Sequence, residues 1–175
     1  MGSDKALLEF EGRPLVLRVA ERLSLVADPV VLASGMPGRL GSLGYREIPD
    51  EVAGVGPLAG LVAGLAASPH ELTAVVAVDM PFISPEVLSL LARLRRDEDA
   101  VVPVSAAGQE PLHALYARSA LGPLRLALEE GRLELRAVLA GLRVREVHSE
   151  EWLASDPTAR FALNVNRPGD LPFLR

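Results

Sequence analysis

Apolar positions along the chain recur at two different spacings, and each spacing is typical of one kind of element. Between residues 14 and 26, apolar side chains such as Leu15 and Val19 return every three or four positions, with arginine and glutamate between them. This period predicts an amphipathic helix with Pro14 at its start. Residues 73–79, TAVVAVD, instead form a continuous apolar run that ends in a carboxylate. Such a run is typical of a strand in a parallel sheet that is covered on both faces.

The same two patterns alternate along the rest of the chain. They predict further helices at 58–67, 84–96, 119–131, 134–142 and 149–155, and further strands at 28–34, 45–50, 99–105, 110–117 and 143–147, with an extended run at 161–166. Strands that alternate with helices predict the α/β fold class, here a three-layer α/β/α sandwich around a Rossmann-like, mostly parallel sheet. No linker, repeat or low-complexity tract divides the sequence, so we expect one domain, residues 1–175.

Composition and charge narrow the classes of function. The formal net charge of −5 argues against a nucleic-acid partner, because neutralising phosphates needs a basic surface. The chain contains no cysteine, which excludes disulfides, thiolate zinc sites and cysteine nucleophiles and fits a reducing compartment. No apolar stretch reaches the roughly 18 residues that a membrane span needs. We therefore expect a cytoplasmic protein with no membrane partner.

Two aspartates directly follow predicted strands, where the ligands of open α/β sheets bind. Asp50 ends the segment YREIPD, and Asp79 ends TAVVAVD. The turn after Asp79, which contains Met80 and Pro81, would hold the carboxylate at the edge of the sheet, where it could bind Mg²⁺. The alternative for both aspartates is an ordinary turn or helix cap.

Lys5 is the only lysine among the 18 basic residues of the chain. A compact ammonium suits a phosphate group whose charge moves between oxygens during a reaction; the alternative is a solvated residue near the N-terminus. Asn164 and Asn166 alternate on a predicted extended segment and so share one face. Their amides could bind a heterocycle or a ribose, or they could form turns.

Three glycines and one histidine leave their roles open. Gly54, Gly56 and Gly60 permit either a close approach of a ligand to the backbone or tight packing of a helix. His113 lies in a predicted apolar strand, where a hydrogen-bonded core histidine is a better interpretation than a base. None of these residues identifies a function singly.

Several segments, taken together and in their order along the chain, are more specific than any single residue. They read MGSDKALLEFEGRPLV, then IPD followed by GVGPLAGLVAGL, VAVDMPFISPEVLSLL, PLHALYARSALGPL and FALNVNRPGDL. This series closely resembles the molybdenum cofactor guanylyltransferases of the nucleoside-triphosphate transferase superfamily. The resemblance implies transfer of GMP from GTP to the terminal phosphate of molybdopterin, with Mg²⁺ as cofactor and pyrophosphate as product. Other proteins that make or receive the molybdenum cofactor are the further partners it implies.

The resemblance also implies roles for individual residues. It assigns GTP binding to Gly2, Lys5, Asp50 and Asp79, and the molybdopterin side to Gly56, Gly60, Asn164 and Asn166. Within the first group, Lys5 would contact the triphosphate, Asp79 would bind Mg²⁺, and Asp50 would contact the nucleotide. Catalysis would then consist of positioning and charge neutralisation, with no general base, because the attacking phosphate is already ionised.

The sequence departs from this family at its start. Members normally begin with a hydrophobic strand and a glycine-rich loop, and only the last two residues of that loop, Met1 and Gly2, are present here. The absent strand would be central, so we expect its neighbours to have unpaired edges and uncovered apolar faces. Three accounts are open: the polypeptide starts upstream, another chain supplies the strand, or the protein is an inactive homologue that binds the cofactor.

Two other functions share most of these features. A sibling nucleotidyltransferase, acting on the same cofactor with CTP or on a sugar phosphate, would use the same lysine and metal-binding aspartate. A non-catalytic carrier of molybdopterin would explain the absent loop. Base selectivity separates the first alternative from the guanylyltransferase, and molybdopterin binding without GTP affinity would support the second.

We predict that a polypeptide which truly begins at Met1 has low stability and little or no GTP turnover. The physical reason is the loss of the backbone N–H groups that cradle phosphates in such a loop. Measurement of GTP turnover on a product of verified mass tests this, and full activity of the 175-residue polypeptide would contradict it.

Overall fold

The computed structural model describes residues 4–36, 38–50, 52 and 54–165. Its helices are α1 (Leu15–Leu23), α2 (Pro57–Ala67), α3 (Pro85–Leu94), α4 (Leu121–Glu129), α5 (Leu135–Leu139) and α6 (Ser149–Trp152). Its strands are β1 (Glu9–Phe10), β2 (Arg13–Pro14), β3 (Val31–Ala33), β4 (Arg46–Ile48), β5 (Leu72–Val76), β6 (Ala100–Ser105), β7 (Gly108–Gln109), β8 (His113–Ala117) and β9 (Val144–Val147). Three 3-10 turns, η1 (Lys5–Leu7), η2 (Arg118–Ala120) and η3 (Arg160–Ala162), complete the elements. Among the described residues, no helix has the length and apolar character to cross a membrane.

The α/β fold class predicted from the sequence is confirmed, and the strand directions are mixed. The larger sheet has the order β5-β8-β6-β7, with β9 parallel to β6, and a separate parallel pair is formed by β3 and β4. Strand β8 runs antiparallel to both β5 and β6, in contrast to the mostly parallel sheet expected from the sequence. The reason is that β6 and β8 are joined by a short connection that contains β7. A connection this short can join neighbouring strands only when they are antiparallel.

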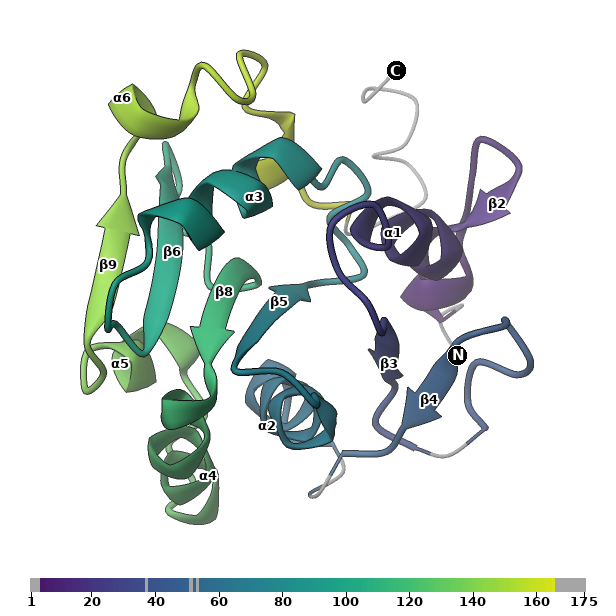
Figure 1. The fold of residues 1–175 in the computed structure, drawn as a ribbon. Coiled ribbons are helices and arrows are strands. Elements are labelled where there is room, and N and C mark those ends of the chain that lie inside the picture. Colours follow the sequence, from purple (N-terminus) through teal and green to yellow (C-terminus); the bar gives the residue numbers. More distant parts are fainter. Residues whose placement is uncertain (1–3, 37, 51, 53, 166–175) are drawn as a thin grey trace.

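Helices lie on both faces of the larger sheet (Figure 1), and its side chains pack alternately into the two layers. On one face, Ala100, Val102 and Tyr116 pack into a cluster with residues of α2, α4 and α5. On the other face, Val101 and Leu115 pack with residues of α1, α3 and α6. Successive side chains of β6 and β8 point to opposite faces of the sheet, so helices pack on both faces. This gives the three-layer arrangement predicted from the sequence.

Local sequence signals place the ends of two helices. Ser84 precedes α3, and its hydroxyl accepts a hydrogen bond from the N–H of Val87 at 3.2 Å, as the pattern SPE predicts. Pro57 is the first residue of α2, and it follows Gly56, whose φ of 92° is unfavourable for other residues. Both signals were local, so both could be recognised without knowing the fold.

The extended run predicted at 161–166 is wrong in its first part. Phe161 lies instead in the 3-10 turn η3 and is fully buried. Its ring lies 4.7 Å from His113 and 5.0 Å from Trp152, centroid to centroid. The Asp156 carboxylate accepts the N–H of Phe161 at 3.3 Å. Tertiary packing of one aromatic ring thus overrides the extended tendency of the local sequence.

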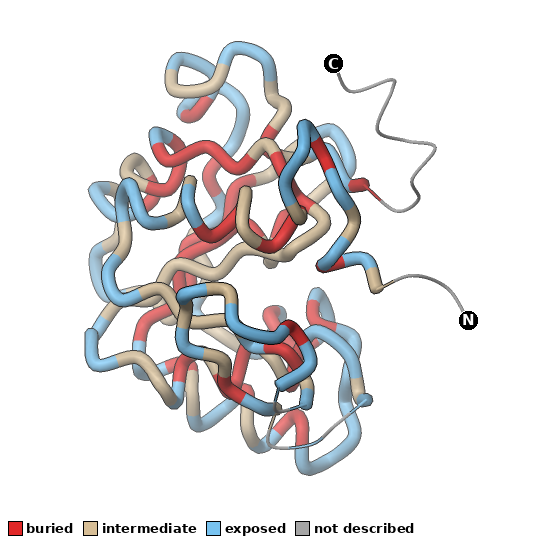
Figure 2. Tube along the Cα trace, turned by 90° about the vertical axis from the view of Figure 1, so that its right-hand side faces the viewer, coloured by how far each residue is buried: buried red, intermediate tan, exposed pale blue. Residues whose placement is uncertain are grey.

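The β3–β4 pair and the larger sheet face each other across a cavity of about 720 Å³. Within the described residues, β5 pairs only with β8, and β3 pairs only with β4. The cavity is lined by both strands, and all five residues of β5 are only half-buried. The prediction that β5 is a strand is confirmed. The prediction that its side chains are buried on both faces of the sheet is not, because none of them is fully buried. Figure 2 shows the buried segments inside the molecule and the exposed ones on its outer loops.

We predict that Asp99 stabilises the junction of β6 and β9 in a pH-dependent way. Its carboxylate accepts hydrogen bonds from Ser119 Oγ at 2.6 Å, from the Arg143 N–H at 3.0 Å and from the Arg143 guanidinium, which lowers its pKa to about 2. Because the folded pKa lies below the unfolded value of about 3.9, this stabilisation is complete above pH 4 and is lost as the pH falls towards 2.

Asp99→Asn should therefore lower the free energy of unfolding at pH 7 by roughly 1 kcal/mol. Urea denaturation between pH 7 and pH 2 measures the difference, which should shrink as the pH falls. Asp97→Asn is the matched control, because Asp97 bonds the same arginine at 2.9 Å from a side chain that is 83% exposed. An equal effect of the two substitutions would contradict the prediction.

Candidate functional site

The loop that follows β5, residues 79–84, is fixed at both of its ends. The carbonyl oxygen of Asp79 accepts the N–H of Val165 at 2.7 Å, and the N–H of Met80 is bonded to the carbonyl of Ala77 at 3.2 Å. Met80 and Ile83 are buried and anchor the loop in the core. Asp79 itself is half-buried and lines the cavity between β3 and β5. The backbone of Asp79 is thus held beside the cavity, just after the carboxyl end of β5.

Two arginines of α1 hold the middle of the 79–84 loop. Arg18 Nε donates to the carbonyl of Pro81 at 3.2 Å, and Arg22 Nε donates to the carbonyl of Ile83 at 2.9 Å. Residues four apart on a helix lie on one face, so the pair reaches successive parts of the loop. The sequence placed these arginines on the polar face of the helix but had no signal for the carbonyls they would contact.

His113 holds the end of the same loop from β8. Its Nε2 accepts the N–H of Ser84 at 3.1 Å, and the side chain is completely buried. Burial lowers the pKa of His113 to about 4, so the imidazole is neutral near pH 7 and carries its proton on Nδ1. Among the described residues Nδ1 has no hydrogen-bond partner. His113 is therefore a core histidine that positions a loop, the interpretation favoured from the sequence.

Asp50 lies two residues after β4, between the loop that follows β3 and the first turns of α2. A Cβ on Gly35 would lie 3.5 Å from Asp50 Oδ2, and a Cβ on Gly60 would lie 3.7 Å from Oδ1. Burial raises the pKa of the Asp50 carboxyl, while the charge of Arg39 and the N–H of Gly35 lower it. Oδ1 is buried and has no hydrogen-bond partner in the described part of the chain. An acceptor of this kind is suited to a donor group on a ligand.

Arg39 joins the N-terminal turn η1 to the loop after β3, and the sequence predicted no role for it. Its guanidinium forms an ion pair with Asp4 and donates from Nε to the carbonyl of Ser34 at 2.5 Å. Asp4 in turn caps η1, because its carboxylate accepts the N–H of Ala6 at 3.0 Å. Lys5 is exposed on this turn. The only signal for Arg39 was a positive charge in a glycine-rich loop, which is too common to be specific.

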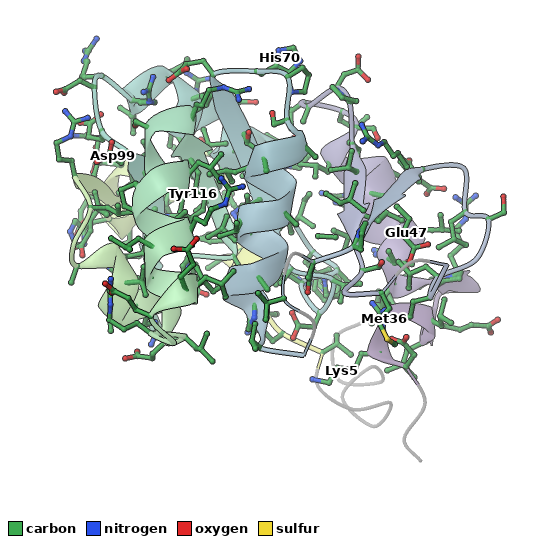
Figure 3. The ribbon with its side chains drawn as sticks, turned by 90° about the horizontal axis from the view of Figure 1, so that it is seen from below. Lys5, Met36, Glu47, His70, Asp99 and Tyr116 are labelled. Atoms are coloured by element: carbon green, nitrogen blue, oxygen red, sulfur yellow. The ribbon has the colours of Figure 1, made fainter. Side chains whose placement is uncertain are left out.

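Four of the eight predicted site residues, Lys5, Asp50, Gly60 and Asp79, lie in or next to the lining of one end of the cavity. Ala6, Arg39, Gly60 and Asp79 line that end, with Lys5 next to Ala6 and Asp50 against Gly60. In Figure 3, Lys5 lies at the opposite end of the molecule from His70, which lines the far end.

The remaining predicted residues are placed less directly. Asn164 is exposed and precedes Val165, whose N–H bonds the carbonyl of Asp79. Gly56 is exposed where α2 begins, one helical turn before Gly60. Gly60 lies against Asp50, so a residue assigned to the molybdopterin side contacts one assigned to GTP. Gly2 and Asn166 fall outside the described residues.

A divalent cation at this site would have Asp79 as its protein ligand. The described residues contain no group of three His, Cys, Asp or Glu side chains that could hold a metal ion. One carboxylate beside an open cavity fits Mg²⁺, which commonly uses one or two protein carboxylates and completes its octahedron with water and substrate phosphates. The donor set therefore suits Mg²⁺ that arrives with a phosphorylated substrate.

Solved structures with the same fold include nucleotidyltransferases. Molybdopterin-guanine dinucleotide biosynthesis protein A from Archaeoglobus fulgidus aligns with a TM-score of 0.86 and 30% identity, over 99% of this chain and 89% of that one. The 2-C-methyl-D-erythritol 4-phosphate cytidylyltransferase of Thermus thermophilus aligns with a TM-score of 0.69 and 21% identity, over 97% and 91%. The second likeness is one of fold alone.

Sequence comparisons identify the family. The probable molybdenum cofactor guanylyltransferase of Pelotomaculum thermopropionicum is 33% identical, over 98% of this chain and 83% of its own. The molybdenum cofactor guanylyltransferase of Desulfosudis oleivorans is 32% identical, over 97% and 85%. A family model described as the MobA-like NTP transferase domain matches residues 1–149. The chain therefore belongs to the MobA-like NTP transferase domain family.

Proposed function

We propose that this protein transfers GMP from GTP to the terminal phosphate of molybdopterin, forming molybdopterin guanine dinucleotide and releasing pyrophosphate. The observation that carries the proposal is that Asp79 lines the cavity, while Asp50 lies against Gly60 and Lys5 precedes Ala6, two further residues of its lining. The names of the curated relatives support the choice of substrates. The cytoplasmic location predicted from the sequence is part of the same proposal.

The reaction needs charge neutralisation more than proton transfer. A phosphate oxygen of molybdopterin forms a new bond to the α-phosphorus of GTP, and the bond from that phosphorus to the oxygen bridging to the β-phosphate breaks. Both substrates are anions, so their repulsion must be reduced before they meet. The ammonium of Lys5, on the turn held by Asp4 and Arg39, would lie against the triphosphate. The nucleophile is already ionised, so the chain needs no general base.

Asp79 would hold Mg²⁺ against the phosphates. When bound, the ion supplies positive charge to the phosphate oxygens and a fixed point around which they are oriented. The protein's contribution is to keep the carboxylate still, through Val165 at its carbonyl and through Arg18 and Arg22 at the carbonyls that follow. A carboxylate fixed beforehand does not have to be ordered when substrate binds.

Asp50 would accept a hydrogen bond from the nucleotide. Its buried Oδ1 has no partner among the described residues, and such an atom gains most from a new donor. Asn164, beside the strand end, would face molybdopterin together with Asn166. Gly56 and Gly60 would allow the backbone of α2 to come close to the substrates, with Gly60 shared between the two sides.

We predict that Asp79→Asn lowers turnover at least a hundredfold, because the neutral amide binds Mg²⁺ poorly and leaves the phosphate charge uncompensated. Product formation from GTP and molybdopterin, together with calorimetric titration of GTP in the presence of Mg²⁺, measures the effect. Asp28→Asn is a matched control at the far end of the same cavity. Equal turnover of CTP and GTP would overturn the choice of guanine, and molybdopterin binding without any GTP binding would overturn the enzyme.

We predict that Arg22→Gln lowers kcat by roughly tenfold to a hundredfold while the protein stays folded, because the 79–84 loop loses its donor at Ile83 and Asp79 is less well placed. Steady-state kinetics give kcat and KM, and thermal unfolding reports on the fold. Arg13→Gln is the control, since the side chain of Arg13 forms an exposed ion pair with Glu21 on the outside of α1. A variant with unchanged kcat would show that the loop does not need this contact.

A further inference from the structure

Arg39 bonds two separate segments from different nitrogen atoms of one guanidinium group. Its Nη1 forms the ion pair with the carboxylate of Asp4, and its Nε donates to the carbonyl oxygen of Ser34 at 2.5 Å. The side chains of Arg39 and Asp4 are 30% and 29% exposed, so the pair is partly shielded from water. A planar group with donors in fixed directions sets the separation of the segments it bonds, which a flexible point charge does not.

The Asp4 end of this contact holds the turn that carries Lys5. Asp4 caps η1, because its carboxylate accepts the N–H of Ala6 at 3.0 Å. Leu40, the residue after Arg39, packs with Ala6 in one buried apolar cluster. A polar contact and an apolar contact therefore hold η1 against the loop that follows β3.

The Ser34 end of the contact leads to Asp50 through one peptide group. The carbonyl oxygen of Ser34 and the N–H of Gly35 belong to that group. Its oxygen accepts from Arg39, and its N–H donates to the Asp50 carboxylate. A hydrogen bond to a peptide oxygen polarises the group and strengthens the bond that its N–H donates. Arg39 thus acts on Asp50 through the backbone, in addition to the effect of its charge.

The Ser34–Gly35 peptide group is itself held in place. The N–H of Ser34 donates to the carbonyl of Ile48 in β4 at 3.1 Å, and Ser34 Oγ donates to the carbonyl of Met36 at 2.9 Å. Ser34 is buried, and Met36 lies at the same end of the molecule as Lys5 (Figure 3). A peptide group fixed in this way transmits a displacement of its partner instead of absorbing it.

We propose that Arg39 is a positioning residue that makes the Lys5 turn and the Asp50 carboxylate take up their positions together. The use of this coupling rests on the proposed function, in which Lys5 contacts the triphosphate and Asp50 contacts another part of the same nucleotide. One guanidinium then sets the distance between the two contacts. A nucleotide held at one of them gains the other at a lower entropic cost, because the second segment is already ordered.

The first test needs no nucleotide and compares Arg39→Lys with Arg46→Lys. An ammonium presents its donors from one atom, so Arg39→Lys keeps the positive charge and loses one of the two contacts. Amide hydrogen exchange should become roughly fivefold faster in residues 6–8 and in residues 34–35. Arg46 is exposed on β4, and its substitution should leave both segments unchanged. Faster exchange in only one segment, or in neither, would overturn the proposal.

The second test asks whether the two ends respond to each other. Asp4→Asn removes the ion pair at η1, and we expect amide exchange in residues 34–35 to become faster, although the substitution lies on another segment. In the Arg39→Lys background the same substitution should have no further effect on residues 34–35, since the connection is already broken. An equal effect of Asp4→Asn in both backgrounds would show that the two ends are independent and would overturn the coupling.

The third test measures the coupling in nucleotide affinity, by calorimetric titration of GTP in the presence of Mg²⁺. Lys5→Met and Asp50→Ala each remove one proposed contact. With Arg39 in place, the double variant should lose roughly fivefold less affinity than the product of the two single losses. In the Arg39→Lys background the two losses should simply multiply, whereas the Arg46→Lys background should keep the coupling. This non-additivity is the informative readout, because a protein that is merely less stable does not change it.

The outcomes separate this proposal from the proposed function. Losses of affinity that multiply in both backgrounds would overturn the coupling of the nucleotide contacts. If hydrogen exchange shows the coupling and the wild-type protein binds no GTP, the proposed function is overturned and the coupling of the two segments by Arg39 stands.

Discussion

The pairing of β8 with two neighbours is the constraint on which the rest of the structure depends. All five residues of β8 are buried, with β5 on one side and β6 on the other. Its alternate side chains supply both helical layers, and its first residue, His113, reaches the 79–84 loop. One strand thus sets the two cores and the position of the site. A substitution that tilted it would move Asp79 even if every contact of Asp79 itself were preserved.

Much of this arrangement could be predicted because the signals are local. The period of apolar residues in α1, the SPE start of α3 and the apolar run of β5 need only a few neighbouring positions to be recognised. The direction of β8 could not be predicted in this way. It depends on the short β7 connection, which a pattern of single strands does not show. The turn at Phe161 was missed for a related reason, because it depends on rings that are distant in sequence.

The candidate site shows the same difference between local sequence signals and contacts that depend on the fold. Lys5 and the two aspartates could be named as candidates because each has a position or a residue type that is unusual for this chain. Arg18, Arg22 and Arg39 were not found, because arginine is the ordinary cation of this chain. Arg18 and Arg22 bond main-chain carbonyls that lie 63 and 61 positions away, and Arg39 bonds the nearby carbonyl of Ser34, which no side-chain pattern reveals. Residues that hold a loop through carbonyl groups leave no pattern in their own neighbourhood. Such positioning residues become visible only when the fold brings helix and loop together.

The separation of β3 and β4 from the larger sheet has a consequence for cooperativity. Within the described residues, no strand ladder joins the two parts, so they are coupled through side chains and through α1 and α2. Side-chain contacts around a cavity couple the unfolding of two parts less strongly than a continuous ladder of backbone hydrogen bonds does. The two parts can therefore unfold locally at different free energies. The part that carries Asp50 and Arg39 would then behave as a separate foldon beside the one that carries Asp79, and substrates bound between them would join the two into one unfolding unit.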